Sequence, residues 1–308
     1  MTLTLVYADR LPYICHRLAT CGLALAGHIN VLKGTDSLAK HFRQYFQVVS
    51  ADTAALRRCV YAIRYRVYCE ELGLENPTDF PDGLEHDACD EHARHALLLH
   101  RPSGEHVGCV RLILADNQNP DAPFPFEKFC RPGLRRTLSG AGPLRRSEVG
   151  EISRLAVQAK YRRRSGELES PNGMDTPTQS KASLRGAMVT DTAHAISALP
   201  NTGWTPESQR RIFPHIAPIL YFAGAAMALS EGLSLAFVMM EPRLARHLRR
   251  YGILFHQVGD IVEYHGQRGP FRIRREDLLD HLGPQMHELL AVIKEDLRAP
   301  LTIREHAS

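Results

Sequence analysis

The sequence predicts a mixed α/β fold, in which helices flank a sheet. Short runs rich in β-branched and aromatic residues alternate with segments whose apolar residues recur every three or four positions. Two strand-like runs are joined by the segment RPSGE, whose proline, serine and glycine are typical of a turn, so we expect a hairpin there. The order helix, strand, strand, helix, strand in the first half is the beginning of a mixed sheet.

The first half of the chain contains three predicted strands. A helical or irregular lead-in over residues 1–43 comes before a strand over Tyr45–Ala51. A helix follows, with Asp52 or Thr53 as its cap and Gly73 at its end. Its apolar residues have helical spacing: Leu56, Cys59, Val60, Ile63, Val67 and Leu72. The later predicted elements are the hairpin strands 95–100 and 106–115, a helical patch at 126–130 and a strand over Val149–Gln158.

The second half resumes the pattern after a segment of different composition. Residues 166–210 are rich in Ser, Thr, Gly, Pro and Asn and have few large apolar side chains, which predicts a flexible insertion. A helix over 212–232, a buried strand over 233–240, a helix over 241–252 and a strand over 253–259 are expected next. A turn, a short strand and a C-terminal helix complete the chain. We therefore expect one domain over residues 44–285, followed by a C-terminal helix and tail over 286–308.

The composition is ordinary for a globular protein, with 44% hydrophobic and 23% charged residues. A net charge of +4 is too small to argue for a nucleic-acid partner. The seven cysteines form no CxxC pair, which indicates reduced thiols. The apolar N-terminal run is broken by charged residues, so we expect no cleaved signal peptide. The longest apolar run, Ile216–Leu229, is shorter than the roughly 20 residues that span a bilayer, and we expect a cytoplasmic protein.

The stretch EHDACDEHARH, Glu85–His95, concentrates acidic residues, histidines and a cysteine in a predicted loop. A structural zinc site usually has two ligand pairs separated by a longer loop, and only one such cluster occurs here. The spacing of a calcium loop is also absent. We therefore expect no metal, which leaves a solvated acidic loop or a set of charges held for a substrate.

Charged residues inside otherwise apolar strands bear on the role of this acidic loop. Arg111 lies within GCVRLIL, and Glu151 and Arg154 lie within GEISRLAV. An unpaired charge in a buried strand is costly, so the two arginines require acidic partners. The candidate partners are Glu85, Asp87, Asp90 and Glu151. Two interpretations remain: an ion-pair network that only orients the sheet, or a polar pocket that receives a charged or amide-bearing substrate.

Four motifs in this order resemble those of the acyl-homoserine-lactone synthases, a branch of the GNAT acyltransferase superfamily. They are RYRVY from Arg64 to Tyr68, EHDACD from Glu85 to Asp90, the strand residue Arg111, and EISRL from Glu151 to Leu155. The resemblance covers roughly residues 45–165. It implies a GNAT-type fold, with a mixed, mostly antiparallel sheet flanked by helices.

The sequence departs from those synthases at Tyr68 and Leu155, where they carry Phe. The segments YRRRSGE and MMEPRLARHLRRYGILFHQVG, together with the long insertion, more closely resemble the PEP-CTERM/exosortase system-associated acyltransferases and the related long-chain N-acyl amino acid synthases. That similarity covers nearly all of the chain after residue 40. It puts lactone formation in doubt, because the acceptor amine need not be S-adenosylmethionine.

The resemblance assigns roles to particular residues. It implies a catalytic set, with Glu151 as the base that makes the attacking amine neutral, directly or through a water: Glu151, Ser153 and Arg154. It implies an acceptor-binding set: Arg64, Tyr68, Asp87, Asp90 and Arg111. It implies a donor-binding set at the splayed fourth strand and the following turn: Leu155, Val157, Arg162, Arg163, Arg164 and Gly166. His86, Cys89, His92 and His95 are expected to be incidental.

The resulting hypothesis is an N-acyltransferase that moves a fatty acyl group from acyl carrier protein or acyl-CoA to the amine of an amino acid or a related small molecule. No bound cofactor is expected. The alternatives are an acyl-homoserine-lactone synthase that uses S-adenosylmethionine, and a catalytically silent GNAT-like module that binds an acyl carrier or a lipid. Transient contact with a membrane is left open, because a long-chain product must leave the enzyme.

Overall fold

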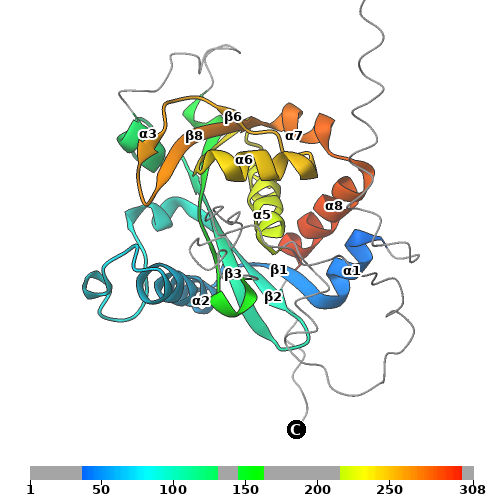
Figure 1. Cartoon of the computed structure of the whole chain (residues 1–308), viewed down its shortest axis with the longest axis horizontal. Helices are drawn as coiled ribbons and strands as arrows, with labels where there is room; N and C mark the ends of the chain where they lie inside the picture. The colour runs from blue at the N-terminus through cyan, green and yellow to red at the C-terminus, as the bar shows by residue number, and fades with distance from the viewer. Residues whose placement is uncertain (1–36, 131–144, 163–215, 300–308) are drawn as a thin grey trace, which may run out of the picture. The chain divides into compact units, whose positions relative to one another are not determined.

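An eight-stranded, mostly antiparallel sheet forms the centre of the fold (Figure 1). The computed structural model describes residues 37–130, 145–162 and 216–299. The strand order is β1-β2-β3-β4-β5-β8-β6, and β7 pairs with β8. Only β4 and β5 run parallel to each other. The predicted mixed α/β class, with a mostly antiparallel sheet flanked by helices, is therefore confirmed.

The elements of the first half agree with the sequence pattern. They are α1 (Leu38–Tyr45), β1 (Phe46–Ser50), α2 (Ala54–Tyr65) with a π-helical turn (Arg66–Glu71), 3₁₀ turns (Pro77–Asp79 and Ala88–His92), β2 (Ala93–His100), β3 (Glu105–Leu114), α3 (Pro125–Cys130) and β4 (Val149–Val157). Of the two predicted caps of α2, Thr53 takes the position, because its side chain accepts a hydrogen bond from the Leu56 N–H. The helical segment ends before Gly73, which has a φ of +60°. Strands β2 and β3 form the predicted hairpin.

The second half differs from the prediction in two places. Its elements are α5 (Ile216–Ser230), β5 (Leu235–Met240), α6 (Pro242–Leu248) with a 3₁₀ turn (Arg249–Tyr251), β6 (His256–Gln257), β7 (Val262–Glu263), β8 (Gln267–Arg274), α7 (Arg275–His281) and α8 (Pro284–Arg298). The strand expected over 253–259 has only two residues. The single expected C-terminal helix is two helices, because Pro284 restricts the residue before it to extended backbone and begins a new helix.

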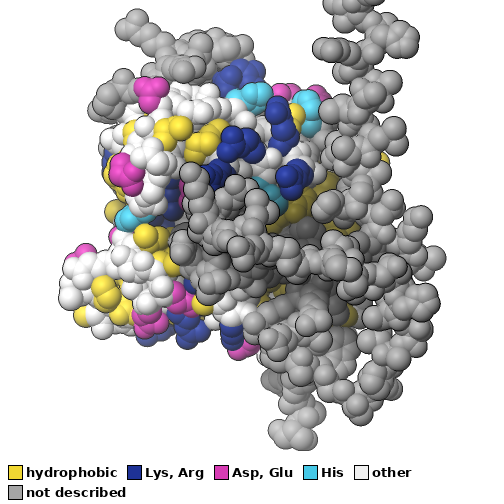
Figure 2. All heavy atoms as spheres, in the orientation of Figure 1, with side chains coloured by type: hydrophobic (Ala, Val, Ile, Leu, Met, Phe, Trp, Pro, Cys, Tyr) yellow, Lys and Arg dark blue, Asp and Glu magenta, His cyan; other side chains and the backbone are white. Residues whose placement is uncertain are grey.

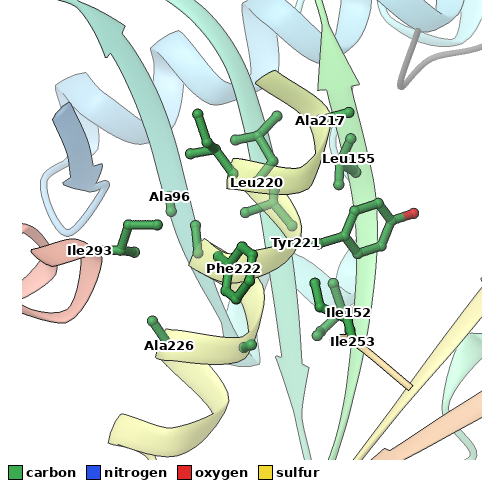
Figure 3. Close-up of a cluster of buried hydrophobic side chains, with 14 of the residues drawn as sticks. Ala96, Ile152, Leu155, Ala217, Leu220, Tyr221, Phe222, Ala226, Ile253 and Ile293 are labelled. Carbon is green, nitrogen blue, oxygen red and sulfur yellow. The ribbon is translucent and has the colours of Figure 1, made fainter. Parts of the chain in front are cut away.

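Helices cover both faces of the sheet. On one face α5 packs on β3 and β4, while α8 packs on α5 and β1, with α1 beside it (Figure 1). Helix α5 is buried on nearly all sides, which explains why its sequence is apolar all round (Figure 3). On the other face α2 and α3 cover two smaller apolar clusters. None of the described helices is long and apolar enough to cross a membrane.

Strands β4 and β5 separate partway along their length. Their pairing runs from Val149↔Leu235 to Ile152↔Val238, although β4 continues to Val157 and β5 to Met240. At the paired end Gly150 packs closely against β3 and the residues before β5, because a Cβ there would lie 2.7 Å from Leu233 Cδ1 and 2.9 Å from the Ile113 carbonyl oxygen. Beyond Ile152 the two strands diverge and leave a gap in the sheet.

The predicted insertion at 166–210 and most of the lead-in over 1–43 lie outside the described residues. The predicted domain boundaries therefore stay predictions.

Candidate active site

The acidic loop of EHDACD is held in shape by its own side chains. The 3₁₀ turn Ala88–His92 begins at Asp87, whose carboxylate accepts a hydrogen bond from the Cys89 N–H at 2.9 Å. In return Asp90 accepts the Asp87 N–H at 2.8 Å. This reciprocal capping orders the turn, so that Oδ1 of Asp87 and Oδ1 of Asp90 both accept from Arg111 of the sheet. The loop is therefore ordered, with Asp90 buried and His86 and Glu91 exposed.

Arg64 forms the buried centre of the charge network. Its side chain is fully buried, and its guanidinium pairs with Glu85 and, at 2.8 Å, with Asp90. Burial by itself raises the pKa values of these carboxyl groups, but the nearby guanidinium groups outweigh it and hold both pKa values below their ordinary range. Arg64 therefore contacts the loop and not a cavity, since it is absent from the lining of the pocket described below.

Arg111 joins the same loop to β4. Its Nη1 lies 2.7 Å from Asp87 and 2.8 Å from Asp90, and its Nε donates to Ser153 Oγ at 3.1 Å. The prediction that this strand arginine has acidic partners in the loop is confirmed. Arg111 is 2% exposed, so its charge is already neutralised within the protein.

Arg154 occupies an irregular point of β4. The register between β3 and β4 shifts around it, and its φ is +49°, a left-handed conformation that costs a non-glycine residue about 1–3 kcal/mol. Its guanidinium lies 3.1 Å from both Glu75 and Glu85. These two ion pairs stabilise the bulge at the point where β4 leaves β5.

Glu151 differs from the carboxylates of the charge network. Among the described residues it has no ion-pair partner, so its candidacy as a partner of Arg111 or Arg154 was wrong. It is 3% exposed and accepts only the Phe126 N–H, at 3.1 Å. Burial raises its pKa from 4.5 to about 7. A carboxyl group with this pKa exchanges its proton near neutral pH.

A cavity of about 60 Å³ opens where β4 and β5 diverge. It has contributions from β4, β5, α5, α6, β8 and the π-helical turn: Tyr68, Ile152, Ser153, Arg154, Leu155, Tyr221, Val238, Met239, Met240, Glu241, Leu244 and Arg268. Its lining is drawn from both faces of the sheet. Glu151 precedes the lining residue Ser153 by two positions, which places their backbones about 6–7 Å apart along the strand.

Two tyrosines border this cavity in different ways. Tyr68 donates its hydroxyl hydrogen to the Leu155 carbonyl oxygen at 3.0 Å. Tyr221 is 5% exposed, and within the described part of the chain its hydroxyl has no hydrogen-bond partner. Figure 3 shows its ring beside β4, with the oxygen directed away from the surrounding apolar side chains. Of these two tyrosine hydroxyl groups, the one of Tyr68 is therefore engaged in a hydrogen bond, and the one of Tyr221 is not.

Of the six predicted donor-binding residues, the three that the structure describes are not brought together. Leu155 lines the cavity, but Val157 is buried in the main apolar core. Arg162, predicted to bind the donor, is 5% exposed, and its Nη2 lies 2.6 Å from Glu71, so its charge is already paired. Arg163, Arg164 and Gly166 lie outside the described residues.

The residues expected to be incidental form no metal site within the described ranges, where no group of three or more His, Cys, Asp or Glu could hold an ion. His95 is buried, with its Nε2 3.6 Å from Asp90, and burial lowers its pKa to about 4. It is therefore neutral at ordinary pH. His86 and Tyr61 make a ring contact in the same region.

Sequence reasoning missed four residues that complete the site: Glu75, Tyr221, Glu241 and Arg268. Glu75 lies in a loop with no motif, and Tyr221 sits in a helix whose apolar pattern indicates only core. Two charges were signals that could have been noted: Glu241 directly follows a buried strand, and Arg268 lies two residues after Gly266.

Comparison with known proteins agrees with this architecture. Residues 63–169 match the family model of the acetyltransferase (GNAT) domain, a segment that includes β2, β3 and β4 and most of the charge network. An acyl-homoserine-lactone synthase of Aeromonas salmonicida is 31% identical over 108 residues, which are 35% of this chain and 46% of the synthase. The aligned part thus spans just under half of that relative.

Similar solved structures include TofI in complex with an inhibitor and MTA, and FeeM, an N-acyl amino acid synthase from uncultured soil microbes. TofI has a TM-score of 0.46 and 19% identity, covering 78% of this chain and 99% of that chain. FeeM has a TM-score of 0.44 and 12% identity, covering 77% and 94%.

Proposed function

We propose that this protein is an N-acyltransferase, which transfers a fatty acyl group from a thioester donor to the amine of an amino acid or a related small molecule. The observation that carries the proposal is the buried carboxyl group of Glu151. Its pKa is raised to about 7, and it lies two residues before Ser153, which lines the cavity between β4 and β5. The match of residues 63–169 to a GNAT acetyltransferase domain supports acyl transfer as the reaction type.

The reaction needs a neutral amine. Its nitrogen attacks the thioester carbonyl carbon, the carbon–sulfur bond then breaks, and the sulfur leaves as a thiolate. The proton lost by the nitrogen passes to the carboxylate of Glu151 and finally to the thiolate, so charge and atoms balance. A base whose pKa lies near the working pH is the most effective for such a transfer.

Glu151 acts through a water in this proposal. Its carboxyl group does not line the cavity, but Glu151 lies two positions before Ser153, which does. A bridging water can carry the proton between the carboxylate and an amine in the cavity. The hydrogen bond from the Phe126 N–H holds one carboxyl oxygen, which leaves the other for the water.

The gap between β4 and β5 supplies the second requirement, stabilisation of the oxyanion. Backbone groups of β4 beyond Ile152 face the gap without a partner strand on that side. An N–H group fixed there is a preorganised donor for a developing negative charge. Because Leu155 lines the cavity and Val157 is in the core, we assign this role to the backbone at Leu155.

Arg64, Arg111, Asp87 and Asp90 serve as the frame of the acceptor side. Their charges are paired with one another, so they position β4 and the loop more than they attract a ligand. Asp87 is the exception, because its side chain is 35% exposed. It is the member of this set best able to contact an acceptor.

An acidic acyl carrier protein is our proposed donor partner. Four exposed arginines lie on α6 and the turn after it: Arg243, Arg246, Arg249 and Arg250. Figure 2 shows basic side chains gathered over the part of this face where Figure 1 places α6. Leu244 of the same helix lines the cavity, so a carrier bound there would sit beside it. These residues take the role that the sequence assigned to Arg162.

The test is an assay of free thiol release by the purified protein. Acyl-CoA and acyl carrier protein loaded with a fatty acyl group are supplied in separate arms with the twenty amino acids. The products are identified by mass spectrometry. We expect thiol release that depends on an amino acid and falls about 10²- to 10⁴-fold in Glu151→Gln. Release of no thiol in any arm would refute the proposal.

A second candidate is acyl-homoserine-lactone synthesis, which is favoured by the 31% identity to the Aeromonas enzyme. An arm containing S-adenosylmethionine distinguishes it, because only a lactone synthase would yield an acylated lactone there. The link to PEP-CTERM/exosortase systems rests on the motifs of the second half of the chain and is proposed on that basis alone.

A further inference from the structure

The cavity between β4 and β5 holds two guanidinium groups in different electrostatic states. Arg154 is bound to Glu75 and Glu85. Arg268, at the start of β8, has no ion pair or hydrogen bond within the described part of the chain. It is the pocket-lining arginine whose charge has no counter-charge bound to it.

Arg64 and Arg111 could bind a ligand only by breaking existing ion pairs. Arg64 and Arg111 bind the carboxylates of Glu85, Asp87 and Asp90, of which Glu85 and Asp90 are buried. Turning either arginine toward a ligand would break an ion pair with a buried carboxylate, which is strongly unfavourable. An anionic ligand in the cavity can therefore bind Arg268 without breaking an ion pair that the structure describes.

Arg268 lies opposite Glu241 at the edge of the cavity. In the β5–β8 ladder Met240 pairs with Gly269, so Arg268 and Glu241 are the next residues outward, one on each strand. Both line the cavity, yet no ion pair within 4 Å joins them. The charge of Arg268 also acts on the hydroxyls of Tyr68 and Tyr221, which lie in the same lining.

We propose that Arg268 binds the α-carboxylate of an amino-acid acceptor in the cavity between β4 and β5. A guanidinium group can hold a carboxylate through two parallel hydrogen bonds, which orients the acceptor as well as attracting it. This inference rests on the proposed function and deepens it, because it restricts the acceptor to amines that carry a carboxylate next to the nitrogen.

Glu241 argues for a carboxylate rather than a phosphate of the donor. A donor phosphate brings only negative charge, and Glu241 in the same lining would repel it. An amino acid arrives with an ammonium group that Glu241 attracts. The volume of about 60 Å³ also suits a compact polar head group and not an extended acyl chain.

The test compares each accepted amino acid with its decarboxylated amine, for example phenylalanine with 2-phenylethylamine, in the wild type and in Arg268→Gln. We expect Arg268→Gln to lower kcat/KM for the amino acid about 10- to 100-fold and for the amine less than threefold. Arg268→Lys should recover part of the loss. Arg275→Gln, an exposed arginine that follows the same strand, is the matched control for folding and net charge.

Three results would overturn the inference. Equal losses for the amino acid and the amine would show that Arg268 supports the fold or the donor. A rise in KM for the acyl donor alone would place a donor phosphate at Arg268. If the wild type acylates no amine, the proposed function fails. Calorimetry with the twenty amino acids then tests this inference separately. Binding of an amino acid that is abolished by Arg268→Gln would support it, and no binding to the wild type would refute it.

Discussion

Replacement of Glu151 by glutamine tests the electrostatics of the site independently of any assumed substrate. The pKa of Glu151 is raised from 4.5 to about 7 by burial. At about 1.4 kcal/mol for each tenfold change, the ionised carboxylate reduces the free energy of unfolding by about 3 kcal/mol. Glutamine keeps an acceptor for the Phe126 N–H and carries no charge, so it removes this penalty.

The sign of the effect follows from the order of the two pKa values. Below pH 4.5 the carboxyl group is protonated in both states and contributes nothing. Between pH 4.5 and about 7 the unfolded chain releases the proton while the native state retains it, so stability falls as the pH rises. Above about 7 the loss is complete. The stability of Glu151→Gln relative to the wild type should therefore rise by about 2.5 kcal/mol from pH 5 to pH 8.

Urea unfolding followed by circular dichroism at several pH values measures this difference. A buried amide N–H in the variant adds a constant offset of about 1–3 kcal/mol, so the dependence on pH, and not the offset, is the readout. Glu70→Gln, at an exposed carboxylate, controls for the loss of one negative charge. Parallel curves for the wild type and Glu151→Gln would refute a raised pKa, and with it the reason for naming this residue as the base.

Three further results are expected. Arg64→Gln removes one of the two guanidinium partners of each buried carboxylate, Glu85 and Asp90, and should lower the free energy of unfolding by about 3–5 kcal/mol in urea titrations; a loss below about 1 kcal/mol would contradict the buried network. Gly252→Ala places a Cβ 2.5 Å from the His281 carbonyl oxygen at a φ of +79°, so thermal unfolding should begin several degrees lower, whereas an unchanged Tm would contradict this geometry. Arg246→Glu with Arg250→Glu should raise KM for acyl carrier protein at least about tenfold and leave KM for acyl-CoA unchanged, and equal effects on both donors would contradict docking at α6.

The parts of the site that the sequence predicted are those encoded by local pattern. The strand Val149–Val157 and the β2–β3 hairpin were found within one or two residues, because alternation and turn chemistry are local properties. The need of Arg111 and Arg154 for acidic partners followed from their place in apolar strands. The candidate partners of these two arginines were four carboxylates, of which Glu85, Asp87 and Asp90 are confirmed.

The errors share a different cause, which is that sequence pattern carries no distance between remote segments. Glu151 was a candidate for an ion pair, but the fold encloses it among apolar side chains of α3 and β5 instead. Arg162 was predicted to bind the acyl donor, but its guanidinium group is bound by Glu71, 91 residues earlier. Neither contact could be inferred from residues nearby in the chain.

The sequence by itself determined the class of fold, the order of its strands along the chain and the residue types that carry charge, because each depends on periodicity or on the cost of burying a charge. Only the tertiary structure decided which charges cancel and which remain. That decision depends on where β4 and β5 part, since the gap brings Tyr221 and Arg268 to one cavity from helices and strands far apart in the chain. The pKa of Glu151 and the uncommitted charge of Arg268 are therefore properties of the packed molecule and not of any motif.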